Sequence, residues 1–140
     1  MATSDSTAQR NASLQSFVTS LGANAIARLY STSRPAGPGT AASGTLLATL
    51  TFGSTNILDA NGGSAGSVSG GVLTTGGYTQ TAGSHVAGTP GYIRWLTSGG
   101  TAVRDTDVSS SAVAGNVQFS GTVATGVNIT GAITYTDGNP

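Results

Sequence analysis

The single histidine is the first residue to test for chemistry. General acid–base catalysis, or catalysis by a serine nucleophile, would have to use His85 with an aspartate orienting its ring. His85 lies in a run of small residues, 82–88, that is typical of a loop, and no Gly-x-Ser-x-Gly motif sits at a strand-to-helix elbow. The sequence therefore predicts a histidine at the surface or in an interface, and a protein that is not an enzyme.

Two carboxylates at alternate positions are the next candidates. Asp105 and Asp107 lie on one face of a predicted strand, where calcium could use their oxygens. Calcium takes six or more oxygen ligands, usually from several carboxylates clustered in a loop, and nothing nearby supplies the rest. We therefore expect no bound metal, a cross-strand partner for Asp105 and a role in a turn for Asp107.

The sequence also lacks the residues needed for thiol chemistry, for a phosphate-binding loop and for binding to nucleic acid. There are no cysteines, so thiol nucleophiles and thiolate metal sites are excluded. A P-loop needs a lysine and a helix after the glycines, and the chain contains no lysine. Five arginines balanced by five aspartates cannot neutralise several phosphates, so we expect no cofactor and no direct binding to nucleic acid.

The charge content is unusual for a monomer. Charged residues make up 7% of the chain, the formal net charge is zero, and glutamate is absent together with lysine. Monomers normally keep a well-charged surface, so this composition favours a surface covered by partners, although serine and threonine also keep a surface hydrated. No apolar run is long enough to span a membrane, and the N-terminus lacks the pattern of a secretory signal.

The N-terminal region predicts the only helix. Leu14, Phe17, Val18 and Leu21 recur at the spacing of one helical face, so we expect a helix over residues 11–21. Ser6 or Thr7 is expected to cap its start and Gly22 to end it. Residues 1–10 are predicted to be an extended arm, and residues 11–140 a single domain.

The rest of the chain alternates with the period of β-strands. Valine, threonine and aromatic residues favour strands, and glycines separate them. We predict an all-β fold, a jelly-roll-like β-sandwich of about eight strands with one short N-terminal helix. The expected strands are 25–31, 44–52, two short strands marked by Val68, Val72-Leu73 and Tyr78, then 92–96, 101–108, 116–123 and 126–136.

Charge predicts the register of the hairpin formed by strands 92–96 and 101–108. A two-residue loop, Gly99-Gly100, sets Arg94 opposite Asp105. A three-residue loop would set Arg94 opposite Arg104, and like charges directly opposite one another destabilise a sheet. We therefore predict the two-residue loop in a type I′ turn, which also places Leu96 opposite Val103.

Aromatic residues raise the alternative of a carbohydrate-binding module. Trp95 and Tyr92 lie on opposite faces of one strand, so they cannot form a single flat platform for a sugar. Trp95 is expected to be a core residue.

Three stretches resemble a known family. They are Arg28-Leu29-Tyr30-Ser31, the strand segment Ser43–Phe52, and Gly88–Thr101 with its hairpin. Together with the short helix, this pattern resembles small jelly-roll decoration (cement) proteins of tailed-bacteriophage capsids, over roughly residues 11–136. The shared motifs are strand and turn patterns and carry no catalytic residue.

The resemblance implies a virion structural protein. Such a protein would bind between subunits of the major capsid protein on the capsid exterior, as a dimer or trimer, after being made in the host cytoplasm. A tail or fibre component, or a carbohydrate-binding module that recognises a host surface, is the alternative. The N-terminal quarter is mildly positive, which suits either docking to an acidic protein surface or ordinary surface arginines. The expected protein-interface residues lie in the arm and in the Pro/Gly-rich loop: Thr3, Ser4, Arg10, Arg34, Pro35 and Pro38.

Overall fold

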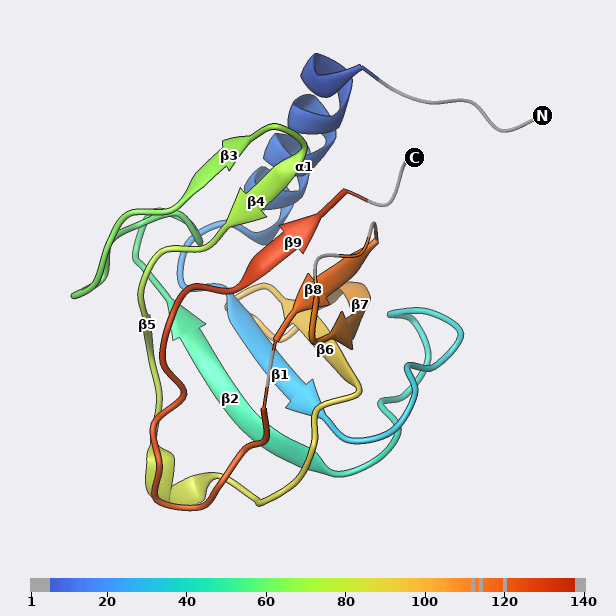
Figure 1. The fold of residues 1–140 in the computed structure, drawn as a ribbon, viewed down its shortest axis with the longest axis vertical. Coiled ribbons are helices and arrows are strands. Elements are labelled where there is room, and N and C mark those ends of the chain that lie inside the picture. Colours follow the sequence, from blue (N-terminus) through green and yellow to red (C-terminus); the bar gives the residue numbers. More distant parts are fainter. Residues whose placement is uncertain (1–5, 112, 114, 120, 138–140) are drawn as a thin grey trace.

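The structure is a computed structural model that describes residues 6–137 except 112, 114 and 120. Within these residues the chain forms one α-helix, one short 3-10 helix and nine strands (Figure 1). Their bounds are α1 Thr7–Leu21, β1 Ile26–Tyr30, β2 Leu46–Phe52, β3 Ser67–Ser69, β4 Val72–Thr74, β5 Tyr78–Thr79, η1 Ala82–Ser84, β6 Tyr92–Leu96, β7 Ala102–Ser109, β8 Asn116–Gln118 and β9 Thr134–Thr136.

Helix α1 begins four residues earlier than the apolar spacing indicated. The Ser6 side chain accepts a hydrogen bond from the Gln9 N–H, which satisfies one of the unpaired donors of the first turn, and Gly22 ends the helix at a φ of 69°. Both predicted caps are confirmed. Residues 7–10 are helical, so the prediction of an extended arm is wrong for them, and residues 1–5 lie outside the described residues.

The described strands join in one mixed sheet, in the order β3-β4-β9-β8-β7-β6-β1-β2-β5. Neighbouring strands are antiparallel except β7 and β8, which are parallel. The predicted class, a sandwich-like all-β fold with a single N-terminal helix, is confirmed. The helix supplies its apolar face to the core that the sheet encloses.

Aromatic side chains fill the centre of that core. Phe17 of α1 meets the rings of Trp95 and Tyr135 edge-on, at centroid distances of 5.6 and 5.8 Å. Trp95 is fully buried, as predicted, and its Nε1–H donates to the Thr106 hydroxyl. Arg104 lies over the Phe17 ring, 4.5 Å from its centroid. The inner face of the sheet is therefore closed by the helix.

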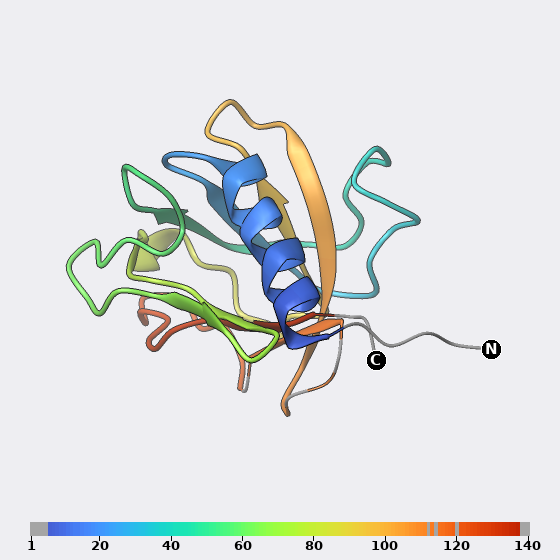
Figure 2. The ribbon, with the colours of Figure 1, turned by 90° about the horizontal axis from the view of Figure 1, so that it is seen from above.

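The outer face of β6 and β1 carries a second buried cluster. Tyr92, Arg94 and Leu96 alternate with the core residues of β6 and yet are buried. Tyr30 stacks on Tyr92 with ring centroids 5.1 Å apart. Residues 31–45, which we name the clamped loop, connect β1 to β2 and lie on the side of β7 opposite to α1 (Figure 2).

The β6–β7 hairpin has the predicted pairing but not the predicted turn. Arg94 lies opposite Asp105, as expected. The turn, however, has three residues, because the Thr97 N–H donates to the Thr101 carbonyl and only Gly100, not Gly99, has a positive φ. A bulge between Trp95 and Leu96 then shifts the register by one residue, so Leu96 lies opposite Ala102 rather than Val103.

The chain after β8 departs most from the predicted strands. Segment 119–133, which is described apart from residue 120, is largely irregular, and β8 and β9 have three residues each. Side chains replace a ladder here: the Gln80 amide bonds both the N–H and the carbonyl of Ile129, and the Tyr78 hydroxyl donates to the Gly131 carbonyl. The region 61–91 contains three short strands, β3, β4 and β5, instead of two.

Candidate functional site

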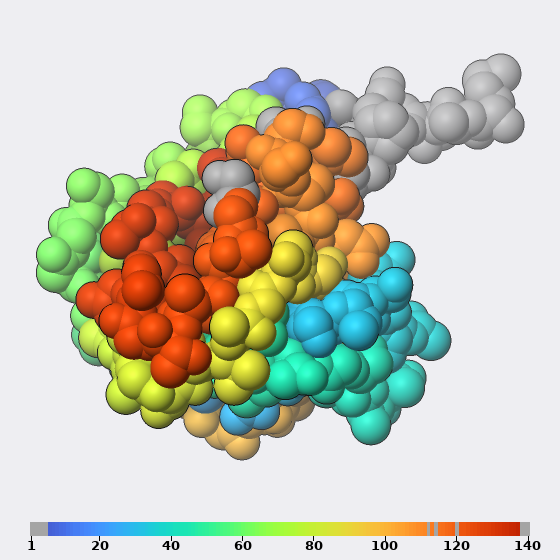
Figure 3. Space-filling view, turned by 60° about the horizontal axis from the view of Figure 1, so that its bottom comes forward, coloured from blue at the N-terminus to red at the C-terminus, as the bar shows by residue number. Residues whose placement is uncertain are grey.

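His85 is buried, so the prediction of a surface or interface histidine is wrong. The residue is 3% exposed, and its Nδ1 lies 3.2 Å from the Val127 carbonyl oxygen, which accepts the hydrogen bond. The Thr125 hydroxyl donates to the His85 carbonyl, and the Gly126 N–H donates to the Ala82 carbonyl. His85 therefore fastens the turn at 82–85 to segment 119–133, which lies beside it on the face shown in Figure 3.

The described residues contain no cluster of the kind that holds a metal ion. Among residues 6–137, apart from the three gaps, no cluster of three or more histidine, cysteine, aspartate or glutamate side chains could hold a metal ion. The two candidate aspartates both face arginines. Asp105 has the predicted cross-strand partner, Arg94, whereas Asp107 belongs to strand β7 rather than to a turn and pairs with Arg34.

The pair of Arg94 and Asp105 is the most buried charged contact of the described chain. Two parallel hydrogen bonds of 2.8 and 2.9 Å join Nε and Nη2 of Arg94 to the two carboxylate oxygens. The side chains are only 9% and 1% exposed. The hydrogen bonds that Arg94 donates to Asp105 raise the pKa of Arg94 above its ordinary value, against the opposing effect of burial. The guanidinium therefore stays charged and fixed in place.

The same guanidinium holds the clamped loop. Nη2 of Arg94 also donates to the carbonyls of Thr40, at 2.8 Å, and Gly37, at 3.4 Å. The Tyr92 hydroxyl donates to the Ser43 carbonyl and accepts from the Ser43 N–H, both at 3.0 Å. Three backbone carbonyls and one N–H of the loop are thus bound by two side chains of β6.

The loop is also fastened along its own length. The Ser43 hydroxyl donates to the Ser33 carbonyl, and the Thr45 N–H donates to the Ser31 hydroxyl. Arg34 reaches Asp107 of β7 at 3.2 Å, but both side chains are nearly half exposed, so this contact adds little to stability. The loop is held by hydrogen bonds at its base and is exposed along its outer edge.

The structure gathers three of the six predicted interface residues. Arg34 is exposed in the clamped loop, and Pro35 and Pro38 are half-buried in it. Arg10 lies on α1 instead, where its guanidinium packs so closely on Gly71 that a Cβ there would come within 2.9 Å of it. Thr3 and Ser4 lie outside the described residues. The predicted set is therefore at least two separate places rather than one.

Two features were missed by sequence reasoning. Arg28 lies on the outer face of β1, beside Arg94. Ala25, Ala27 and Leu29 alternate along the chain and lie in the core, so the residues between them, including Arg28, face outwards. This alternation is visible in the sequence and could have predicted the position of Arg28.

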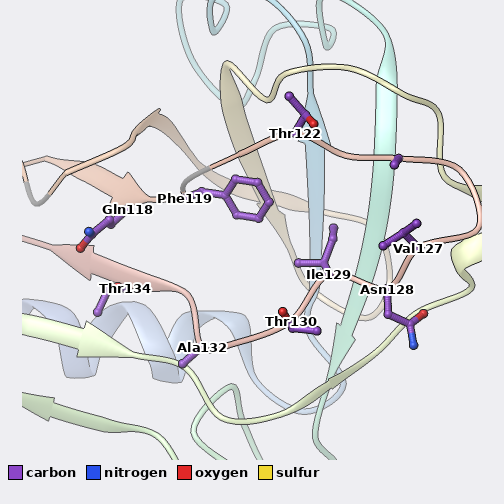
Figure 4. A pocket seen from close by; sticks show the side chains of 10 residues that line it. Gln118, Phe119, Thr122, Val127, Asn128, Ile129, Thr130, Ala132 and Thr134 are labelled. Carbon is purple, nitrogen blue, oxygen red and sulfur yellow. The ribbon is translucent and has the colours of Figure 1, made fainter.

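The second missed feature is a polar hollow of about 400 Å³ beside β8. Figure 4 shows the Phe119 ring directed towards Ile129 across it. Hydroxyl, amide and apolar groups line the hollow, and no charged residue does: Gln118, Phe119, Thr122, Ala124, Val127, Asn128, Ile129, Thr130, Ala132 and Thr134. Apart from Gln118 of β8 and Thr134 of β9, the side chains come from segments without regular structure, which strand periodicity does not place.

Comparisons with known proteins returned no match. No family model matches the chain, and neither a curated protein nor a solved structure matches it. In the described part of the chain, no helix combines the length and the apolar character needed to cross a membrane. The functional interpretation therefore depends on the residues and on the geometry of the site.

Proposed function

We propose that the protein is a virion structural protein that decorates and stabilises the bacteriophage capsid by binding between subunits of the major capsid protein. The resemblance of the strand and turn motifs to capsid decoration proteins motivates this proposal. The observation that carries it is the clamped loop, which is exposed at its outer edge and fixed at its base by Arg94 and Tyr92. A fixed projecting loop suits a docking element.

The physical advantage of the clamp lies in the entropy of binding. A free loop loses conformational freedom when it docks, and each immobilised side chain costs about 0.5–1.5 kcal/mol. The hydrogen bonds to Gly37, Thr40 and Ser43 order the loop before any partner arrives. The prolines at 35 and 38 restrict it further, since a proline ring fixes φ. The loop then presents Arg34 with little further ordering.

The proposed assembly uses many weak contacts. The subunit self-associates as a dimer or trimer on the lattice, and each contact need not be strong because linked sites bind with a high effective concentration. The low charge of the chain is compatible with copies that approach one another without strong repulsion. The proposed location is the exterior of the virion, with synthesis in the host cytoplasm.

A binding assay with particles tests this function. Purified protein is mixed with capsids that were assembled from the major capsid protein of the same phage without it, and bound protein is measured by co-sedimentation. We expect saturable occupancy at a fixed ratio to capsid protein, and a capsid that resists heat better when occupied. Absence of binding at saturating concentration would contradict the proposal.

The polar hollow beside β8 supports a second candidate, a sugar-binding module of a tail or fibre. Sugars are recognised by amide and hydroxyl groups together with an aromatic ring, and Gln118, Asn128 and Phe119 offer these groups. A glycan array probed with the intact protein separates the two functions. Specific glycan binding that is lost in Asn128→Ala, without binding to capsids, would favour the module.

A further inference from the structure

Arg28 occupies the outer face of the sheet next to the clamped loop. Its Cα partners are Thr49 on β2 and Arg94 on β6. Its neighbours Ala27 and Leu29 are fully buried in the core, so the Arg28 side chain points to the opposite face, where it is half-buried. Arg94 is on the same face and is covered by the clamped loop. Arg28 lies opposite Arg94 on the neighbouring strand, β1.

Arg28 differs from the other two arginines near this face, which are each paired with an aspartate. Asp105 binds Arg94, and Asp107 binds Arg34. Within the described residues, Arg28 has no ion pair and no hydrogen bond, and its Nε is buried without a partner. Two guanidinium groups on adjacent strands at the same register repel one another. The outer face therefore carries one positive charge that lacks a counter-charge.

We propose that Arg28 is the docking site for a carboxylate side chain, aspartate or glutamate, of a partner protein. The Nε of Arg28 is buried, so the carboxylate would bind the terminal nitrogens, and a planar guanidinium can hold a carboxylate through two parallel hydrogen bonds. Thr49 lies opposite Arg28 on β2, and Thr51, two residues along the same strand, is on the same face, so both hydroxyl groups can add hydrogen bonds to a bound carboxylate's neighbours. The carboxylate would supply the missing counter-charge.

Among the described residues of the outer face of β1 and β6, Arg28 is the one unbalanced charge, and this points to a protein partner rather than to a nucleic acid. Binding to a nucleic acid requires several phosphates to be neutralised at once, and one free guanidinium does not provide this. An isolated carboxylate needs only one well-placed arginine. The chemistry of the site does not depend on the proposed function, but the identity of the partner, an acidic patch of the major capsid protein, rests on it.

The first experiment tests the carboxylate site alone. The full chain, labelled with ¹⁵N, is titrated with an acetylated Asp-Glu-Asp-Glu amide peptide, and the Nε–H signals of the arginines are followed by NMR. We expect a saturable shift of the Arg28 signal and at least about tenfold weaker peptide binding in Arg28→Gln. Arg28→Lys, which keeps the charge but not the two-pronged geometry, should lie between the two. Thr97→Val, on the β6–β7 hairpin and outside the clamped loop, is the control and should bind the peptide like the unaltered chain.

The second experiment measures the occupancy of Arg28→Gln on capsids, next to Thr97→Val. A selective loss in Arg28→Gln supports the inference together with the proposed function. An Arg28 signal that does not move with the peptide, or that moves equally with chloride at the same ionic strength, overturns the inference whether or not the protein decorates capsids. If the unaltered chain ignores capsids but the peptide shifts Arg28, the proposed function fails and the carboxylate site stands.

Discussion

At the scale of single residues, the contact between Arg94 and Asp105 combines two tasks. It satisfies a buried charge within the hairpin, and it directs one guanidinium nitrogen at the carbonyls of the clamped loop. A buried charge that loses its partner is far more costly than an exposed one, because water cannot replace the partner. The stability of the pair and the order of the loop are therefore linked.

Replacing Asp105 with Asn is predicted to destabilise the protein strongly. The change leaves Arg94 charged in a site where it is almost wholly buried, and breaking such a pair costs about 3–5 kcal/mol. Asp107→Asn is the matched control, since its exposed contact with Arg34 is worth about 0–1 kcal/mol. Urea unfolding followed by circular dichroism measures both. Equal losses in the two variants would contradict the buried role of Asp105.

Tyr78 is predicted to make stability depend on pH at the alkaline end. Burial raises the pKa of Tyr78 above its ordinary value of 10.0, because the phenolate is the disfavoured form there. The folded state then holds its proton more tightly than the unfolded chain. This contribution is fully present below the unfolded pKa of 10.0 and is lost as the pH rises through the folded pKa.

Tyr78→Phe provides the control for this slope. The variant loses the hydrogen bond to the Gly131 carbonyl, which lowers the free energy of unfolding by about 1 kcal/mol at neutral pH. It should also lose part of the decline in stability above pH 10, measured as free energy of unfolding in urea at several pH values. An unchanged decline would assign the effect to other tyrosines.

At the scale of elements, the hairpin shows how a correct register arises from a different turn. Opposite charges on facing strands favour Arg94 opposite Asp105, and these two residues are paired in the structure. A three-residue turn alone would have placed Arg94 opposite Arg104, but the bulge at Val103 adds one residue to β7 and restores the favourable pair. Cross-strand charge thus predicted the pairing of Arg94 with Asp105. A two-residue turn, and a three-residue turn followed by a bulge, give this same pairing, so the sequence did not distinguish the two.

The three-residue turn predicts unequal effects of two glycine substitutions. Gly100 has a φ of 88°, so an alanine there is strained and should cost about 1–2 kcal/mol. Gly99 has no positive φ and only the Thr97 hydroxyl 3.9 Å from a Cβ position, so Gly99→Ala should be nearly neutral. Thermal unfolding of the two variants measures the difference. Similar losses in both would indicate the type I′ turn instead.

The other elements separate into those that periodicity predicts and those that it does not. The helix, its caps and strand β6 follow from apolar spacing and capping residues. Segment 119–133 has alternating residues and yet is irregular, because Gln80, Tyr78 and His85 side chains satisfy its backbone groups. Such contacts join residues more than forty positions apart, and a local pattern does not contain them. The burial of His85 was missed for the same reason.

At the scale of the whole molecule, the sequence predicted the class of fold and one part of the candidate site. Arg34, Pro35 and Pro38 were placed in a Pro/Gly-rich loop, and the structure shows that loop fastened to the outer face of β6. The clamp itself was not predicted, because it depends on which face of β6 Arg94 and Tyr92 occupy and on where a distant loop folds. The proposed docking surface thus has two adjoining parts, the loop and Arg28.

Freeing one end of the clamped loop should weaken docking more than it weakens the fold. Tyr92→Phe keeps the ring that stacks on Tyr30 but removes the hydroxyl that bonds Ser43 twice. Two neutral hydrogen bonds contribute about 1–3 kcal/mol to stability, so the variant should remain folded. Hydrogen exchange at the Ser43 amide should become faster, because that N–H loses its partner.

The effect of Tyr92→Phe on capsids should be amplified by the number of copies. A loop that must be ordered on binding lowers the affinity of each contact, and linked subunits multiply this loss across the lattice. We therefore expect occupancy at limiting concentration to fall at least about tenfold, with recovery at high concentration. Thr97→Val serves as the folded control, because Thr97 is in the turn of the same hairpin and is not part of the clamped loop. Full occupancy by Tyr92→Phe, despite faster exchange at Ser43, would show that order in the loop does not contribute to docking.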